Sequence, residues 1–278
     1  MTARYLSLRH WLRVLVPSMC ALCGGGCDDV VCAACREAYA GARRMRCGQC
    51  ANPLAEIPSL PRGREPKLEL PGTQANLGPR LRGDDVGWGA GDAHGSTLVC
   101  GTCLANQPAF DATIAAVDYA IPLDQLVLQL KFGARLALAP WCARQIRDAV
   151  LARPGLPLPD LLCPVPLGPG RLVERGFNQA LEIARPLAAA LGVACHPALA
   201  LRTLDTPAQS GVAPSVRAQN VRGAFAVEAP DLVEGRHVGL VDDVMTSGHT
   251  LGELAATFKR FGAVRVTNFV FARTPPHQ

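Results

Sequence analysis

The sequence predicts an α/β fold, in which a parallel, twisted sheet is covered by helices on both faces and is preceded by a small zinc-ribbon domain. From about residue 108 onward, apolar runs of strand length alternate with helical patterns, and this order builds a parallel sheet. Before that point, eight of the twelve cysteines form four Cys-x-x-Cys pairs. We therefore expect two domains, residues 1–107 and 108–278.

The bulk properties of the chain set limits without choosing a function. Its 278 residues suffice for two modest domains, and a hydrophobic content of 49% is enough for a packed core. The net charge of +5 is compatible with an anionic substrate or a weak nucleic-acid partner and requires neither. Polar and charged residues interrupt every apolar run well short of a membrane span, so we expect no membrane insertion.

The first twenty residues, MTARYLSLRHWLRVLVPSMC, make a poor secretion signal. Arg9, His10 and Arg13 break the apolar run that such a signal needs. A short amphipathic helix is the simpler interpretation, and we expect a cytoplasmic protein.

Paired cysteines are the strongest signal in the first domain. A Cys-x-x-Cys turn lets both thiolates reach one ion, and four sulfurs complete a tetrahedral zinc site. A disulfide framework would need secretion, and a redox site is not built from four pairs in succession. We predict one or two structural Zn²⁺ ions, with sequential or interleaved pairing both open. The predicted ligands are Cys20, Cys23, Cys32, Cys35, Cys47, Cys50, Cys100 and Cys103.

Between Cys50 and Cys100 the composition changes sharply. The intervening residues include six prolines, eight glycines and one aromatic residue, which cannot build a core. We predict a flexible insertion over about residues 52–98.

In the second domain, hydrophobic periodicity predicts each element in turn. A helix over 122–132 has Leu123, Leu126, Val127 and Leu130 on one face, and a helix over 249–262 has Leu251, Leu254, Ala255 and Phe258 inward. Ligands of such sheets collect at the carboxyl ends of the strands. The other predicted elements are strands over 112–120, 160–167, 237–243 and 264–272, and helices over 136–152 and 178–192.

The stretch HVGLVDDVMTSGHT, residues 237–250, places two carboxylates and a small polar loop between an apolar strand and a helix. Backbone N–H groups at the start of a helix are unpaired, and the helix dipole favours an anion there. Thr246, Ser247 and Thr250 add hydroxyl donors, and Gly248 allows a sharp turn. No Walker-type lysine follows, which argues against a triphosphate. A monophosphate beside two carboxylates that accept hydroxyl groups describes a ribose 5-phosphate.

This stretch resembles the phosphoribosyl-pyrophosphate (PRPP) signature of type I phosphoribosyltransferases. PVPLGPGRLVERGFNQA, residues 164–180, and TPAQSGVAPSVRAQNVRGAF, residues 206–225, are similar to the ComF/GntX family. Members of that family are competence- and uptake-associated proteins with an N-terminal double zinc ribbon and a phosphoribosyltransferase-like domain. The resemblance spans nearly the whole chain, although the long insertion between Cys50 and Cys100 departs from the family's usual short spacing.

The resemblance implies a role for each matching residue. Asp242 and Asp243 would hold the ribose 2′- and 3′-hydroxyls of PRPP. A pyrophosphate loop would lie at residues 167–171, where Arg171 and Arg175 are candidate donors to the diphosphate. Mg²⁺ would arrive on that diphosphate rather than in a protein cage. The 5′-phosphate would be held by Thr246, Ser247, Gly248, His249 and Thr250.

Further positions carry weaker expectations. The resemblance implies that residues 202–222 are a mobile hood over PRPP, and Asn178 is expected to cap the following helix. Lys131 also fits a family pattern, but a lysine at a helix end is expected to bind terminal carbonyl groups. Purine-using relatives often have an Asp where this chain has Thr246, which cannot take up a proton from a purine.

Two function classes remain open. One is a Mg²⁺-dependent phosphoribosyltransferase that supports DNA uptake or the use of imported DNA, a role that the resemblance alone implies. The other is a non-catalytic adaptor that binds PRPP or single-stranded DNA and docks a DNA-processing partner through the zinc ribbon. Aromatic stacking platforms are scarce, which argues against a dedicated single-strand binder. Phosphate contacts and an ordinary soluble surface both explain the basic residues near the knuckles, Arg36, Arg43, Arg44 and Arg46.

Overall fold

The computed structural model describes residues 18–41, 44–54, 98–203 and 223–275. The predicted N-terminal helix, most of the predicted insertion and most of the predicted hood lie outside these ranges. Among the described residues, none of the helices has the length and apolar character that crossing a bilayer requires.

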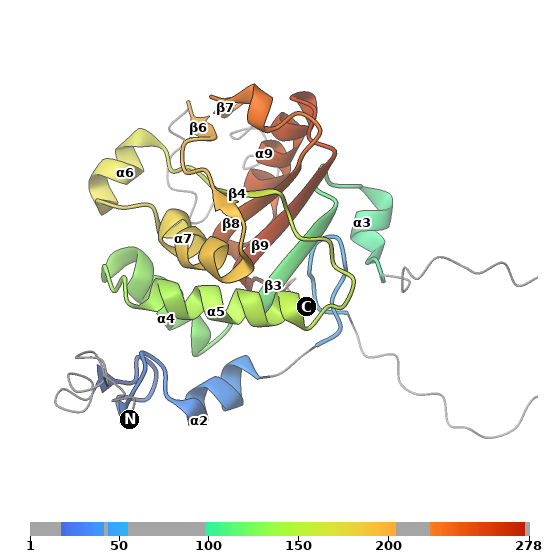
Figure 1. Cartoon of the computed structure of the whole chain (residues 1–278). Coiled ribbons are helices and arrows are strands. Elements are labelled where there is room, and N and C mark those ends of the chain that lie inside the picture. The colour runs from blue at the N-terminus through green and yellow to red at the C-terminus, as the bar shows by residue number, and fades with distance from the viewer. Residues whose placement is uncertain (1–17, 42–43, 55–97, 204–222, 276–278) are drawn as a thin grey trace, which may run out of the picture.

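A five-stranded sheet forms the centre of the molecule, with the strand order β3-β9-β8-β4-β5 (Figure 1). All of its strand pairs are parallel, as the alternation of strands and helices predicts. Every residue of β9 except the first is buried, which is typical of a strand covered on both faces. The strands are β3 (Ala112–Asp118), β4 (Leu161–Pro164), β5 (Ala194–Cys195), β8 (His237–Met245) and β9 (Arg265–Arg273).

Strand register brings three strand ends together at the carboxyl edge of the sheet. Arg273, the last residue of β9, lies opposite Met245 of β8 on one side and Asp118 of β3 on the other. On the next strand, Pro164 of β4 lies opposite Val241. Side chains from distant parts of the sequence therefore meet at this edge.

Helices cover both faces of the sheet, and their predicted inward faces are buried. Helices α4 (Leu123–Phe132), α5 (Leu138–Leu151) and α7 (Gln179–Leu191) lie on one face, and α9 (His249–Arg260) lies on the other (Figure 1). The apolar residues predicted to face inward on α4 and α9 are all buried. Trp141 of α5 packs edge-on against Phe271 of β9, with the ring centroids 5.7 Å apart.

Two predicted segments differ from the structure. The strand predicted over 160–167 ends at Pro164, because two prolines interrupt the ladder, and the residues implied to form a pyrophosphate turn instead open helix α6 (Pro169–Arg175). Pro169 suits the first helical position, and Gly176 at φ +78° ends the helix. Arg171 and Arg175 therefore stand on a helix rather than in a loop.

Short elements complete the described chain. The antiparallel pair β6 (Ala200–Arg202) and β7 (Phe225–Val227) flanks the segment predicted to be a hood. At its end, the Arg202 guanidinium lies 5.6 Å from the centroid of the Phe225 ring. The other short elements are β1 (Ser18–Met19), β2 (Gly26–Cys27), α2 (Ala33–Cys35), the π-helix η1 (Arg36–Ala40), α3 (Gly101–Ala105) and the 3-10 helix η2 (Pro230–Leu232).

Candidate phosphate site and cysteine clusters

The predicted phosphate loop lies between the end of β8 and the start of α9. Thr246 and Ser247 are exposed, and Gly248 takes a left-handed φ of +83° immediately before the helix. A side chain there would have to adopt a conformation that L-residues rarely take. No side chain caps the first turn of α9, and the Ser247 hydroxyl lies 3.1 Å from Nδ1 of His249. The loop thus places exposed hydroxyl groups at the start of a helix, a position whose backbone N–H groups could bind an anion.

The two carboxylates before the loop are not equivalent. Asp243 is 2% exposed, and its Oδ2 lies 2.8 Å from Nζ of Lys131 at the end of α4. The expectation that Lys131 would bind helix-end carbonyl groups is therefore wrong, because the strand offers it a buried carboxylate. Asp242 is partly exposed, and its Oδ1 accepts the backbone N–H of Asp243 at 2.9 Å. Although successive residues of a strand alternate between its two faces, the two carboxylates remain close enough to act on each other.

The electrostatics of this pair distinguish its two members further. Partial burial, and after it the charge of Asp243, raise the pKa of Asp242 well above its ordinary value, while Lys131 acts in the opposite direction. A carboxyl with a raised pKa gains from any partner that stabilises its charged form. Hydroxyl donors of a bound sugar would be such partners for Asp242.

A basic helix stands beside the acids. The chain leaves β4 next to β8, where the Val165 N–H donates to the carbonyl of Val241 at 2.9 Å, and then enters α6. Arg175 at the end of α6 donates to Oε1 of the buried Gln179 and lies 5.6 Å from the centroid of the Phe132 ring. Burial lowers the pKa of Arg175, and the Asp243 carboxylate opposes this effect.

The turn between α6 and α7 is fixed by the residue predicted to cap α7. The side-chain oxygen of Asn178 accepts the N–H groups of Ala180 at 2.9 Å and Leu181 at 3.4 Å. Its Nδ2 donates to the carbonyl of Val165 at 3.0 Å, which joins the start of α7 to the end of β4. The predicted cap is confirmed, and it also orients the basic helix.

The eight paired cysteines form two groups of four, and this resolves the pairing. In each group the four sulfur atoms lie within 4.8 Å of one another. Sequential pairs share a group, so the predicted insertion separates the two knuckles of the second one. The first cysteine cluster is Cys20, Cys23, Cys32 and Cys35, and the second cysteine cluster is Cys47, Cys50, Cys100 and Cys103.

Backbone amides already stabilise one thiolate in each cluster. The Cys32 N–H lies 3.3 Å from Sγ of Cys20, and the Cys100 N–H lies 3.3 Å from Sγ of Cys47. Burial alone would raise the pKa of both thiols, but backbone N–H groups overcome it and lower the pKa to about 6 for Cys20 and about 7 for Cys47. Four converging sulfurs with thiolate character fit the donor set of structural Zn²⁺, so both clusters could hold this ion.

The two cysteine clusters pack on opposite faces of the sheet. Cys20 and Cys35 join the hydrophobic cluster of α4, α5 and α7, and the Gln129 side chain donates to the carbonyl of Ala21 at 3.1 Å. The second cysteine cluster joins the hydrophobic cluster that contains α9, beside Met245 and Leu251. It therefore lies on the face from which the phosphate loop emerges.

A cavity of about 510 Å³ separates η1 and the chain after it from β3 and α5. Arg36, Arg44, Arg46 and Arg153 line it together with Glu37 and Asp148. Of the arginines predicted near the knuckles, the Arg44 side chain is 65% exposed but that of Arg46 only 7%. Arg46 lies 2.7 Å from Oδ1 of Asp118, so this arginine forms a buried ion pair and does not contribute to an exposed DNA-binding surface.

Arg273 belongs to no motif in the sequence, yet it lies next to the candidate site. A charged residue that ends the otherwise apolar strand TNFVFAR is the signal that could have found it. Arg273 is 6% exposed, and it contacts both the second cysteine cluster and the phosphate loop.

Comparison with known proteins gives close relatives over most of the chain, although no protein-family model matches it. The chain is 39% identical to "DNA utilization protein YhgH" of Salmonella typhi over 181 residues, which cover 64% of this chain and 79% of that protein. It is 31% identical to "Competence protein F" of Haemophilus influenzae over 179 residues, 63% of this chain and 78% of the relative. A solved adenine phosphoribosyltransferase from Thermoanaerobacter pseudethanolicus matches 52% of this chain and 72% of its own, at 16% identity and a TM-score of 0.31.

Proposed function

The chain belongs to the ComF/GntX family, whose members join a double zinc ribbon to a type I phosphoribosyltransferase-like domain, and from this premise we propose that it binds PRPP at the carboxyl edge of its sheet. One observation supports this above all others. An exposed hydroxyl-bearing loop with a left-handed Gly248 leads into the uncapped start of α9, directly after the partly exposed Asp242. Groups that can donate hydrogen bonds to a phosphate therefore lie next to Asp242, a carboxylate that can accept hydrogen bonds from sugar hydroxyl groups.

Each part of PRPP has a candidate partner. The 5′-phosphate binds the hydroxyl groups of Thr246, Ser247 and Thr250 and the first amides of α9. Asp242 is the better placed acceptor for a ribose hydroxyl, because Asp243 is buried against Lys131. The pair of Asp243 and Lys131 fixes the end of β8, from which Asp242 projects.

Arg175 and Arg171 on α6 are the proposed donors to the diphosphate, because guanidinium groups match phosphate oxygens in geometry. Mg²⁺ enters with the diphosphate and offsets its charge. If the chain is catalytic, a nucleophile bonds to the ribose anomeric carbon as the bond to the diphosphate oxygen breaks, and pyrophosphate leaves with the electron pair. Arg175 then stabilises the leaving group.

Calorimetric titration of the zinc-loaded chain with PRPP and Mg²⁺ tests the site. We expect a double variant, Thr246→Val and Thr250→Val, to bind at least about a hundredfold more weakly, because hydrogen bonds to a charged group contribute about 1.5–3 kcal/mol each. Thr257→Val is the matched control, since that hydroxyl donates to the Glu253 carbonyl at 2.9 Å within α9. Absence of a binding signal with the unmodified chain would overturn the proposal.

Fragments of PRPP separate the two halves of the site. Arg175→Gln should weaken binding of PRPP and of pyrophosphate but not of ribose 5-phosphate. Catalysis is tested by pyrophosphate release with a panel of bases and nucleic acids. Turnover of hypoxanthine or guanine would contradict the inference that Thr246 excludes a purine acceptor deprotonated at this position.

The relatives are named for DNA utilization and competence, and we extend this role to the present chain. Direct contact with single-stranded DNA is the second candidate function, and the arginine-lined cavity favours it. Arg36 and Arg44 are exposed and line this cavity, and phosphate contacts of this kind supply salt-dependent affinity.

Fluorescence anisotropy with a labelled oligonucleotide at several salt concentrations tests this contact. Replacing Arg36 and Arg44 with Gln should weaken binding and reduce the slope of log K against log salt by about 0.7 per lost contact. Arg185→Gln with Arg260→Gln removes the same charge from exposed sites on α7 and α9. Equal losses in both double variants would indicate a nonspecific charge effect and remove the cavity from the proposal.

A further inference from the structure

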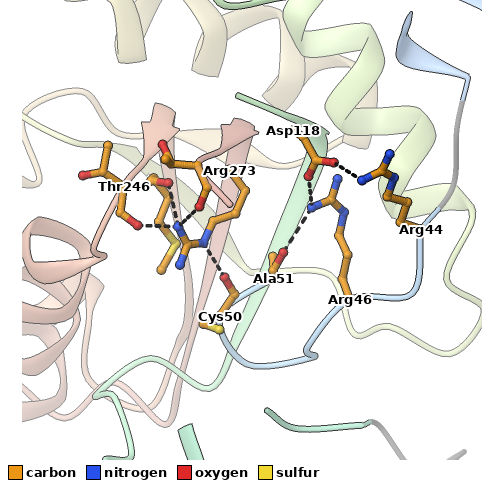
Figure 2. Close-up of polar contacts among 9 residues, drawn as sticks. Arg44, Arg46, Cys50, Ala51, Asp118, Thr246 and Arg273 are labelled. Carbon is orange, nitrogen blue, oxygen red and sulfur yellow. Dashed lines mark hydrogen bonds and ion pairs between the residues drawn. The ribbon is translucent and has the colours of Figure 1, made fainter. Parts of the chain in front are cut away.

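Arg273 joins the second cysteine cluster to the phosphate loop. Its Nε donates to the carbonyl of Cys50 at 2.9 Å, and its Nη1 donates to the carbonyl of Thr246, the first residue of the loop (Figure 2). The same nitrogen donates to the carbonyls of Met245 at 3.1 Å and Thr274 at 2.6 Å. A single guanidinium thus joins two segments that are far apart in the sequence. Its most distant partner, Cys50, precedes Arg273 by 223 residues.

The charge of this group is unusual for its position. Arg273 is 6% exposed, and its four hydrogen bonds all go to backbone carbonyl oxygens. Four thiolates around one Zn²⁺ carry a net negative charge, which would compensate the buried cation.

The knuckle that carries the Cys50 carbonyl needs support from outside. The next residue, Ala51, has a φ of +56°, in the left-handed region that is strained for a residue with a side chain. Arg46 braces it by donating to the Ala51 carbonyl at 3.2 Å while its guanidinium contacts Asp118 (Figure 2). The conformation persists because contacts from the cluster and from these arginines over-determine it.

We propose that Arg273 is a positioning residue that couples metal occupancy of the second cysteine cluster to the order of the phosphate loop. With metal bound, the Cys50 carbonyl is fixed, and Arg273 holds the Thr246 carbonyl in the geometry that aims the loop outward. Without metal, the strained knuckle relaxes and the guanidinium loses both a partner and its counter-charge. The consequence for ligand affinity rests on the proposed PRPP function, whereas the consequence for loop order does not.

Coupling between two sites is reciprocal. Metal in the second cysteine cluster should therefore strengthen PRPP binding, and PRPP should slow metal release from this cluster. The first cysteine cluster packs on the other face of the sheet, and the hydrogen bonds of the Arg273 side chain go to Cys50, Met245, Thr246 and Thr274, so the first cluster provides the internal reference.

Hydrogen exchange on the full-length, metal-loaded chain tests the coupling without any ligand. Arg273→Lys retains the charge but not the planar fork of donors. We expect faster exchange of the Gly252 amide, whose N–H donates to the Gly248 carbonyl at 2.8 Å and therefore measures the order of the loop. Metal content should be unchanged, and PRPP affinity should fall by about tenfold, within the 5–150-fold range typical of coupled sites. Arg265→Lys, at the opposite end of β9, is the matched control.

Metal removal supplies the second arm. The pair Cys100→Ser and Cys103→Ser should accelerate loop exchange at least fivefold more than the pair Cys20→Ser and Cys23→Ser, with Trp141 fluorescence reporting that the sheet is intact. If the cysteine variants unfold, the lysine variant alone decides. Unchanged loop exchange in metal-loaded Arg273→Lys overturns the inference. If the unmodified chain fails to bind PRPP while loop exchange responds as expected, the proposed ligand is wrong but the coupling stands.

Discussion

Replacement of Lys131 by Met probes the buried ion pair beneath the candidate sugar site. The Nζ atom of Lys131 lies 2.8 Å from Asp243, and the two side chains are 24% and 3% exposed. Removing one partner of a buried pair costs about 3–5 kcal/mol, because a buried charge is left uncompensated. A lysine head that still meets some solvent moves the expectation to about 2–3 kcal/mol. For a domain of this size each kcal/mol lowers the melting temperature by about 2–4 °C.

The chain offers a matched control with the same chemistry. Lys259 lies 2.8 Å from Asp111, but these side chains are 30% and 37% exposed. A pair in such contact with solvent contributes about 0–1 kcal/mol, so Lys259→Met should have a small effect. Replacing both Lys131 and Asp243, with Met and Asn, should recover most of the loss, because no unpaired charge remains buried.

Urea unfolding followed by tryptophan fluorescence measures these differences. With Trp11 and Trp88 replaced by Phe, Trp141 is the only remaining indole, and its packing on Phe271 makes it report on the sheet. Zinc is kept in excess so that metal loss does not contribute to the transition. Equal destabilisation by Lys131→Met and Lys259→Met would refute the reasoning, and so would additive losses in the double variant.

Three further outcomes are expected. Gly248→Ala and Gly155→Ala should each lower the free energy of unfolding by about 1–2 kcal/mol, because both glycines have a left-handed φ. Only Gly248→Ala should lower PRPP affinity in calorimetry, because Gly248 lies in the loop and its new methyl would lie 2.5 Å from Cε of Met245. Asp242→Asn should raise thermal stability, and the gain should widen from about pH 4 upward. The raised pKa of Asp242 lets the folded chain keep a proton that the unfolded chain has released, so the stability of the unmodified chain falls as pH rises. A gain that does not change with pH would contradict this. Elemental analysis should give two Zn²⁺ per chain and one after loss of either cysteine cluster, whereas loss of both ions from either variant would mean that the clusters are not independent.

The amino-acid sequence by itself determined the features whose signals are local. Alternating strand and helix periodicities identified the parallel sheet, because hydrophobic period follows backbone geometry. Cys-x-x-Cys spacing identified the eight metal-ligand candidates, and the polar loop before α9 indicated the candidate phosphate site, because a tight turn and a helix start need only neighbouring residues. Even the cap at Asn178 was predictable from its position before the helix.

Tertiary structure alone decided which distant residues meet. Sequential pairing of the cysteines, the burial of Asp243 against Lys131, and the bridge from Cys50 through Arg273 to Thr246 each join segments far apart in the chain. Such contacts depend on strand order and register, which set the neighbours at the carboxyl edge, and no local pattern encodes them. The opening of α6 in place of a predicted turn belongs here too, since Arg175 comes near Asp242 and Asp243 only because β4 lies beside β8.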